Sequence, residues 1–227
     1  MRPSRPHFLP ITLPVFCGFF LLIVLLITLI EIHVLRYAYE KIGIDQRHVL
    51  ALLLLSLLGS YVNIPVAKLP AERVVSGQEI TLFGMRYVMP IVQEWPRTII
   101  AVNVGGAVIP TLLSLYLLVK NSMYGPGLLA VAIVTLVVHR LARPVQGLGI
   151  VVPLFIPPVV AAITALLLAP QAAPSLAYIS GSLGTLIGAD LLNLRQVRGL
   201  SAPLASIGGS GTFDGIFLTG ILAVLLA

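Results

Sequence analysis

Two aspartates near the C-terminal end of the sequence, Asp190 in "LIGADLLNL" and Asp214 in "GSGTFDGIF", are the residues best suited to chemistry. Both lie in apolar, glycine-containing stretches of a chain that has only eight acidic residues. Two carboxyl groups about 3 Å apart share one proton, so that one acts as a base while the other acts as an acid. Such a pair can activate water and protonate a leaving amine, as hydrolysis of a peptide bond requires. Asp190 and Asp214 are therefore the candidate catalytic pair.

Small and polar residues near the two acids could support such a site. Glycines on both sides of the pair would let two backbones approach closely and would admit a substrate chain. Two asparagines in apolar stretches could line the same site, or could join helices by hydrogen bonds of about 0.6–2 kcal/mol. The predicted supporting residues are Gly188, Gly209, Gly211, Gly215, Asn103 and Asn193.

The sequence predicts neither a metal nor a cofactor at this site. Cys17 is the only cysteine, so the usual Cys and His spacing of metal sites is missing. A metal bound by the two aspartates would need further oxygen or nitrogen ligands, for which Asn103 and Asn193 are the nearby candidates. The sequence also contains no phosphate-binding glycine loop, no HExxH motif and no serine nucleophile with a matching histidine.

The elements that would position these residues are membrane-spanning helices. The chain has 227 residues, of which 58% are hydrophobic and 10% are charged, and its mean hydropathy is +1.05. In soluble domains about a quarter of the residues are charged. Several apolar runs reach the roughly 20 residues that a helix needs to cross a bilayer. Because a backbone in lipid must satisfy its own hydrogen bonds, we expect an all-α integral membrane protein.

The apolar runs predict about seven transmembrane helices. They cover residues 14–36, 48–66, 98–119, 124–139, 148–168, 174–193 and 212–227. The longest connection, at about residues 67–97, contains "EITLF" and "MRYVMPIV" on either side of Gly84, which predicts a small hairpin. Because no repeat or domain-length linker interrupts the chain, residues 1–227 are predicted to form a single polytopic membrane domain.

The basic residues predict the orientation of the protein. With a cytoplasmic N-terminus, the connections on the cytoplasmic side hold ten of the 14 Lys and Arg residues, and the outer side holds four. Basic residues gather on the cytoplasmic side of membrane proteins. We therefore predict a multi-pass protein of the cytoplasmic (inner) membrane, with its N-terminus in the cytoplasm and its C-terminus outside. The positive charges are scattered singly, so no binding of nucleic acid is expected.

This orientation brings the two acids to one side of the membrane. Asp190 lies near the cytoplasmic end of the sixth predicted span, and Asp214 near the cytoplasmic start of the seventh. Antiparallel helices joined by a short connection are usually neighbours, so the two carboxyl groups could meet. An ionisable group at membrane depth is a functional candidate by default, because its burial in lipid is costly.

Each aspartate also has a purely structural interpretation. Asp214 follows Thr212 at a predicted helix start, where the helix dipole stabilises an acidic side chain by about 0.3–1 kcal/mol. Asp190 could pair with Arg195 or Arg198, which follow it at the same side of the membrane. The joint placement of the two acids favours a functional role over these separate ones.

The chain resembles, over nearly its whole length, a prokaryotic family of polytopic membrane proteins described only as a domain of unknown function. The resemblance is carried by "YVNIPVAKL", "VNVGGAVIP", "HRLARPVQGLGIVVPLFIPP", "LAYISGSLGTLIGADLLNL" and "IGGSGTFDGIFLTGILAVLLA". It implies a multi-span membrane protein and brings no particular activity with it.

Shorter stretches resemble a second family. "GAD", which ends at Asp190, and "GSGTFD", which ends at Asp214, are similar to the Gly-x-Gly-Asp motif of intramembrane aspartyl proteases, among them presenilins, signal peptide peptidases and prepilin peptidases. "PSLAY" is similar to the Pro-Ala-Leu motif of presenilin-like members. The sequence departs from the pattern in three ways: Ala189 replaces the second glycine before Asp190, two residues separate Gly211 from Asp214, and Pro-Ser-Leu precedes both acids. The resemblance implies a catalytic aspartate on each of two neighbouring spans.

The leading interpretation is an intramembrane protease that cleaves membrane-protein substrates with Asp190 and Asp214 at its cytoplasmic face. The acid and the base of the pair are not assigned, because a coupled pair titrates as a unit. Two alternatives stay open. The two carboxylates could bind a cation or relay a proton in a transporter or channel, or the protein could be a non-enzymatic membrane scaffold. The lipid bilayer is the expected partner in every case.

Overall fold

The computed structural model describes residues 32–70, 80–82, 85–87, 97–145, 149–196, 204–209 and 215–227, together with Leu21, Val24 and Thr28. The chain divides into two units, Met1–Tyr37 and Ala38–Ala227. In the first unit the described residues are helical, and the Thr28 hydroxyl donates to the carbonyl oxygen of Val24 at 2.7 Å. A helix at Ile32–Lys41 runs across the boundary between the units.

The second unit is mostly helical, as the sequence predicts. Its further α-helices are α2 (Gln46–Gly59), α3 (Ile109–Lys120), α4 (Tyr124–Leu141), α5 (Ile156–Leu168), α6 (Ala173–Thr185) and α7 (Gly215–Leu226). A short 3₁₀ turn, η2 (Pro170–Ala172), leads into α6. Two segments are π-helical: η1 (Val104–Val108) leads into α3, and η3 (Leu186–Leu191) continues α6.

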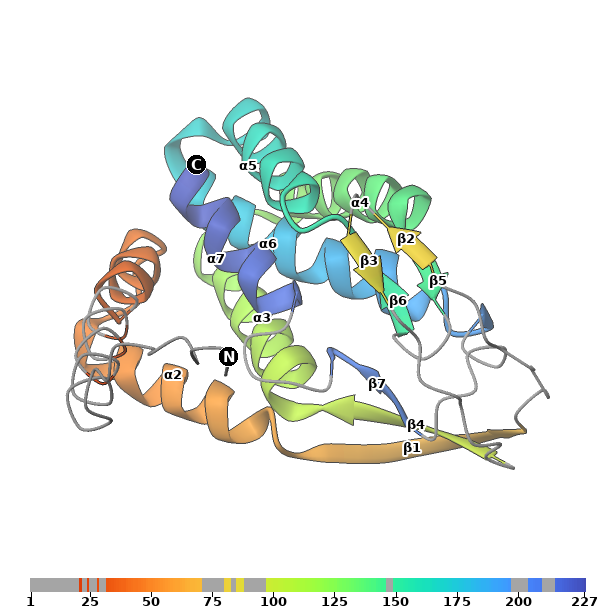
Figure 1. Cartoon of the computed structure of the whole chain (residues 1–227). Helices are drawn as coiled ribbons and strands as arrows, with labels where there is room; N and C mark the ends of the chain where they lie inside the picture. Colours follow the sequence, from red (N-terminus) through yellow and green to blue (C-terminus); the bar gives the residue numbers. More distant parts are fainter. Residues whose placement is uncertain are drawn as a thin grey trace, which may run out of the picture. The chain divides into compact units, whose positions relative to one another are not determined.

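Helix α6 lies at the centre of this unit, and α3, α4, α5 and α7 pack against it (Figure 1). Eleven of its 13 residues are buried. Small residues let its neighbours approach closely: a Cβ atom at Gly184 would lie 2.6 Å from the Cβ of Val134 on α4. Residues 38–42 also pack here, since the rings of Tyr39 and Tyr178 have centroids 6.5 Å apart.

A three-stranded sheet packs beside the helices (Figure 1). Its central strand β4 (Arg97–Asn103) pairs antiparallel with β1 (Asn63–Pro70) and parallel with β7 (Leu204–Ile207). A separate pair joins β5 (Arg143–Val145) to β6 (Gly149–Val151). The strands β2 (Ile80–Leu82) and β3 (Met85–Tyr87) pair antiparallel, which confirms the hairpin predicted in the long connection.

The three-stranded sheet corrects the expectation of an all-α protein. Residues 63–66 and 98–103, expected at the ends of two transmembrane helices, are strands. The sequence of β4, "RTIIAVN", is rich in β-branched residues, which pack well on a pleated surface. Its backbone groups are paired by β1 on one side and by β7 on the other. In the sequence the residues of β4 run directly into the apolar start of the next helix, so apolar content alone predicts one span where the structure has a strand and a helix.

Among the described helices, α4 alone is long and apolar enough to cross a membrane, with 18 residues. The helix Ile32–Lys41 and α2 meet the same criterion only when they are taken together across the bend between them. Helix α5 has 13 residues and α7 has 12. At about 1.5 Å per residue these lengths fall short of a hydrocarbon core of about 30 Å. The described part of the chain therefore does not contain the seven membrane-length helices that the sequence predicts.

Candidate functional site

Asp190 lines a pocket of about 240 Å³ between three segments of the chain. One segment is formed by residues 150–154 and by Pro157 at the start of α5. The second comes from α6 and η3, and the third from the first turns of α7. The lining residues of these two are Thr185, Ala189, Asp190, Gly215, Ile216 and Thr219. The polar side chains of the pocket are thus one carboxyl group and two threonine hydroxyls.

The Asp190 carboxyl group is held by a backbone donor. The Gly208 N–H donates to Asp190 Oδ2 at 2.7 Å. Gly208 has a φ of +86°, a left-handed conformation that residues with a side chain rarely adopt. Hydrogen bonds from N–H groups to a carboxylate are among the stronger ones in proteins, so this contact fixes the orientation of Asp190.

The π-helical geometry of η3 brings Thr185 and Asp190 to the same pocket. In a regular α-helix, at 3.6 residues per turn, side chains five positions apart point about 140° away from each other. The i→i+5 hydrogen bonds of a π-helix bring such residues nearer to one line. Both side chains line the pocket in this structure. Single π-helical turns within α-helices often occur at functional sites.

Thr185 carries a buried hydroxyl group in the wall of this pocket. Thr185 is 5% exposed, and its Oγ1 atom makes no hydrogen bond to any described residue. A buried hydroxyl that lacks a partner costs about 1–3 kcal/mol. Thr185 lines the same pocket as Asp190, and a hydrogen-bond partner for its hydroxyl would remove this cost.

Both π-helical segments converge on Gly208. A Cβ atom at Gly106 in η1 would overlap the carbonyl oxygen of Gly208, whose N–H is bound to Asp190 in η3. Beside this contact lies an apolar cluster from β4, η1, η3, β7 and α7. Its buried members are Ile100, Ala107, Leu186, Ile207 and Ile216. The Asp190 carboxyl group is therefore held by a packed part of the structure, formed by β4, β7, η1, η3 and Gly208, which we call the frame.

Asn103 belongs to this frame and does not line the pocket. It is 1% exposed at the end of β4, and its Oδ1 accepts a hydrogen bond from the Gly106 N–H at 2.8 Å. Its Nδ2 donates to the Ser60 carbonyl oxygen at 2.7 Å and to Asn63 Oδ1 at 3.1 Å. Asn103 thus caps η1 and joins it to β1, so it contributes to the architecture of the site and makes no contact inside the pocket.

Asn193, Gly188 and Gly209 also lie in the frame. The Asn193 Nδ2 donates to the carbonyl oxygens of Gly188 and Ala189 at 2.9 and 3.0 Å, which satisfies acceptors near the end of η3. Gly188 packs on α4, where a Cβ atom would lie 2.6 Å from the Thr135 carbonyl oxygen. Gly209 follows Gly208 with a φ of +77°. None of these three lines the pocket.

The partner acid, Asp214, lies outside the described residues, as does Gly211. Gly215, the residue that follows Asp214 in the sequence, begins α7 and lines the Asp190 pocket. Sequence reasoning missed Thr185 and Thr219. The five-residue spacing between Thr185 and Asp190 could have indicated Thr185 only if the π-helical turn had been anticipated.

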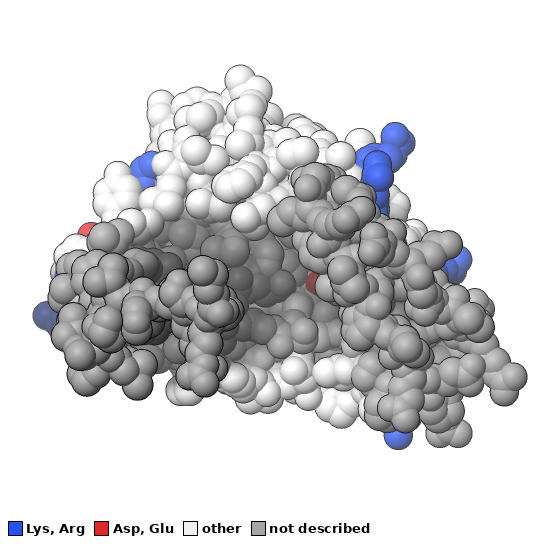
Figure 2. Space-filling model, in the orientation of Figure 1, with Lys and Arg blue, Asp and Glu red and all other residues white. Residues whose placement is uncertain are grey.

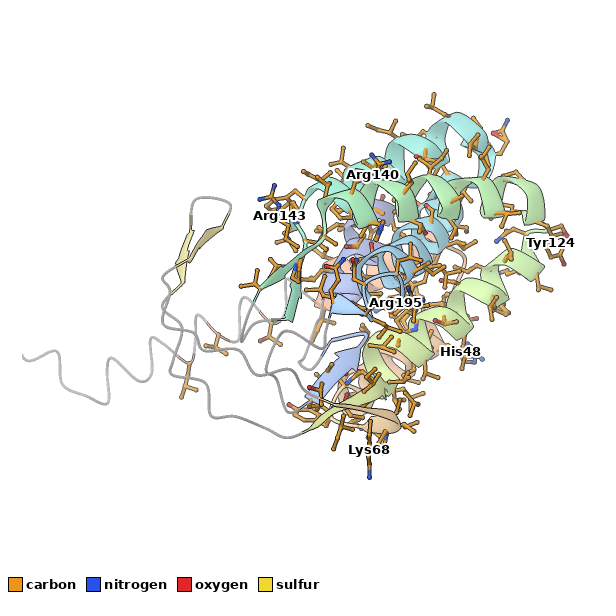
Figure 3. All side chains as sticks on the ribbon, turned by 90° about the vertical axis from the view of Figure 1, so that its right-hand side faces the viewer. His48, Lys68, Tyr124, Arg140, Arg143 and Arg195 are labelled. Carbon is orange, nitrogen blue, oxygen red and sulfur yellow. The ribbon has the colours of Figure 1, made fainter. Side chains whose placement is uncertain are left out.

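Basic side chains mark the end of α4 near η3. Arg140 and Arg143 lie at the C-terminal end of α4, and Tyr124 lies at the opposite end (Figure 3). Segment η3 packs against α4, and a Cβ atom at Gly188 would lie 3.2 Å from the His139 backbone nitrogen. The Asp190 pocket is therefore at the basic end of this helix. Within the described ranges, no three His, Cys, Asp or Glu side chains form a cluster that could hold a metal ion.

Comparison with protein families gives a match over most of the chain. The model of a family described as "Protein of unknown function (DUF1614)" covers residues 57–226, which include every residue of the Asp190 pocket. No curated protein and no solved structure matches the chain. The matched range takes in the sheet, both π-helical segments and helices α3 to α7. The chain therefore belongs to the DUF1614 family.

Proposed function

We propose that this chain is a multi-pass membrane protein that hydrolyses peptide bonds with Asp190 and Asp214. The observation that carries the proposal is that Asp190 and Gly215 line one pocket, because Gly215 is bonded directly to Asp214 in the sequence. The proposal requires the Asp214 carboxyl group to enter the same pocket. The Gly208 N–H holds the Asp190 carboxyl group, and Thr185, whose hydroxyl has no partner among the described residues, lines the same pocket.

In the proposed reaction, one carboxyl group of the pair is protonated and the other is ionised. The ionised group takes a proton from water while the water oxygen bonds to the carbonyl carbon, and the protonated group gives its proton to the carbonyl oxygen. The carbon–nitrogen bond then breaks as the amine nitrogen takes up the proton that came from water. The second carboxyl group regains its proton as the carbonyl re-forms. Thr185 would hold the water or the carbonyl oxygen in place.

The distribution of apolar residues supports a membrane location. Leu128 and Leu136 on α4 are 76% and 57% exposed, and Leu167 on α5 is 77% exposed. In Figure 2, Lys and Arg side chains lie at the margins of the described surface, and the white, described surface at the top of the view between them shows no charged side chain. Large exposed apolar patches mark contacts with membranes or partners. The central helix α6, by contrast, buries serine, threonine and glycine residues.

We further propose that α4 crosses the bilayer with its basic C-terminal end in the cytoplasm. Arg140 and Arg143 follow the positive-inside rule in this orientation. Lys120, which ends α3 four residues before α4 begins, then lies on the outer side. The N-terminus would be cytoplasmic and the C-terminus outside. Seven crossings would require the short helices to cross together with adjoining segments, as in the continuous run Val104–Lys120 formed by η1 and α3.

The test uses the full-length protein reconstituted in phospholipid vesicles with quenched fluorescent transmembrane peptides. Asp190→Asn and Asp214→Asn are each expected to lower the cleavage rate by about 10²–10⁴-fold, the usual contribution of general acid–base catalysis. Asp45→Asn is the matched control. The Asp45 carboxylate accepts a hydrogen bond from the Arg47 N–H at 2.8 Å and caps α2, and asparagine caps a helix equally well.

Three outcomes would replace this proposal. Cleavage that persists in both Asp190→Asn and Asp214→Asn would exclude the carboxyl pair. Ion flux without cleavage, abolished by either substitution, would identify a transporter or channel. A folded, inserted protein with neither activity, in which the substitutions change only partner binding, would identify a scaffold.

A further inference from the structure

A second and larger pocket lies between α2 and α3 and shares no residue with the Asp190 pocket. Its volume is about 760 Å³. Pockets of roughly 300–1,000 Å³ that are lined mainly by apolar side chains, with a few polar groups, are typical of small-molecule sites. The apolar lining comes from both helices, with Leu52 and Leu55 on α2 facing Ile109, Leu112 and Leu113 on α3. We call this pocket the α2–α3 groove.

The two helices of the groove run in opposite directions. At one end, a Cβ atom at Gly59, the last residue of α2, would lie 3.0 Å from the Gly105 backbone nitrogen just before α3. At the other end, Lys120, the last residue of α3, meets Gly43 just before α2. The backbones therefore close the groove at the Gly59 end. The apolar lining extends from there toward Lys120.

The polar groups of the groove gather at the Lys120 end. The Lys120 ammonium donates to the Gly43 carbonyl oxygen at 2.6 Å and lies 5.6 Å from the centroid of the Tyr116 ring. These two contacts hold the ammonium at this end of the groove. His48, labelled in Figure 3, adds a second nitrogen-bearing side chain to the lining. The Asp45 carboxylate at this end is engaged as the cap of α2.

We infer that the α2–α3 groove binds one acyl chain of a bilayer phospholipid, whose phosphate group contacts the Lys120 ammonium. An apolar groove that carries a cation at one end matches a molecule with a hydrocarbon tail and an anionic head. Lysine binds phosphate as a point charge, and its long stem can reach the depth of the head groups. The inference rests on the proposed membrane location, and it assigns the lipid to a site separate from Asp190.

The test is native mass spectrometry of the detergent-purified full-length protein, titrated with phosphatidylglycerol and, separately, with diacylglycerol of the same acyl chains. The wild type is expected to retain one phosphatidylglycerol molecule and to bind diacylglycerol at least tenfold more weakly. Lys120→Ala should weaken phosphatidylglycerol binding at least tenfold, and Lys120→Arg should keep most of it. Ala51→Phe, which fills the groove from α2, should lower the binding of both lipids.

Lys68→Ala is the matched control for the loss of one positive charge. Lys68 is exposed on β1 and does not line the groove (Figure 3). This variant should bind phosphatidylglycerol as the wild type does. A thermal unfolding scan of each variant shows whether the variant is still folded. A variant that stays folded but no longer binds lipid has lost the binding site and not the fold. Lys120→Arg should stay both folded and lipid-bound.

The failures of the two proposals can be told apart. If cell fractionation finds the wild type outside the membrane, the proposed function fails. If the protein is in the membrane but binds the two lipids equally, or if Lys120→Ala binds phosphatidylglycerol as tightly as the wild type, the lipid inference alone is overturned. The second result is also expected if a second copy of the chain or another apolar segment covers the groove.

Discussion

Thr185→Val is predicted to stabilise the fold and to slow the reaction at the same time. Valine has nearly the shape of threonine, so the substitution removes the hydroxyl and leaves the packing of α6 unchanged. The Thr185 Oγ1 is buried without a partner among the described residues, and such a group costs about 1–3 kcal/mol. We expect a gain at the lower limit of this range, about 1 kcal/mol. For a chain of this size this raises Tm by about 2–4 °C.

The effect on activity has the opposite sign. If the Thr185 hydroxyl binds the water or the carbonyl oxygen during hydrolysis, its loss removes one neutral hydrogen bond, worth about 0.5–1.5 kcal/mol. At 1.36 kcal/mol per factor of ten, kcat/KM should fall by about 2–13-fold. A merely structural threonine would raise Tm without any change in rate, so the two measurements together separate the alternatives.

Thr135→Val is the matched control for this prediction. Thr135 lies on α4, its Oγ1 is also buried without a partner among the described residues, and it does not line the Asp190 pocket. The control should show a similar rise in Tm and an unchanged cleavage rate. The assays are thermal unfolding in detergent and peptide cleavage in vesicles. A fall in Tm for Thr185→Val would mean that the hydroxyl has a partner, and an unchanged rate would remove Thr185 from the proposed reaction.

Three further predictions concern the frame and the membrane. Gly208→Ala places a Cβ atom within 2.6 Å of the η1 backbone at a positive φ, so thermal unfolding should show a loss of at least 2 kcal/mol and cleavage should fall with it. Asn103→Leu leaves the buried Gly106 N–H and the buried Ser60 carbonyl without their side-chain partner. The free energy of unfolding, measured by chemical denaturation, should fall by about 2–6 kcal/mol. An unchanged Tm would show that these two hydrogen bonds do not stabilise the fold. In a Cys17→Ser background, Gly125→Cys and Arg143→Cys should react with a membrane-impermeant thiol reagent from opposite sides, and labelling from one side would show that α4 does not cross.

The helices could be predicted from sequence more reliably than the strands. The run predicted at 124–139 is α4 at Tyr124–Leu141, because its apolar residues are bounded by turns on both sides. In β4, Ile99 and Ile100 are equally apolar, and periodicity alone does not separate a short buried strand from a buried helix. Its parallel partner β7 lies about 100 residues later in the sequence, so no local sequence pattern predicts the pairing.

The candidate site was predictable only in part, for a related reason. Asp190 stands out because an acid in an apolar stretch is rare. Thr185 does not stand out, because regular α-helical spacing would put it on a different face of the helix from Asp190. The two residues line one pocket because the segment between them is π-helical. Asn103 and Asn193 have the residue type of a site, but their partners are backbone groups that the tertiary structure supplies. The sequence marks such residues as polar in apolar surroundings without indicating which groups they meet.

The parallel pairing of β4 with β7 also determines the order in which parts of the fold can form during translation. Strand β4 can pair with β1 as soon as both have left the ribosome, but its second partner is about 100 residues away. At about 5–20 residues per second, translation needs a further 5–20 s to reach it. During that interval the helices α3 to α6 can associate, while Gly208 and the first turn of α7 do not yet exist. A chain that stops before residue 204 would therefore hold a helical bundle with Asp190 but no closed pocket, so that the site can assemble only after β7 and α7 have been made.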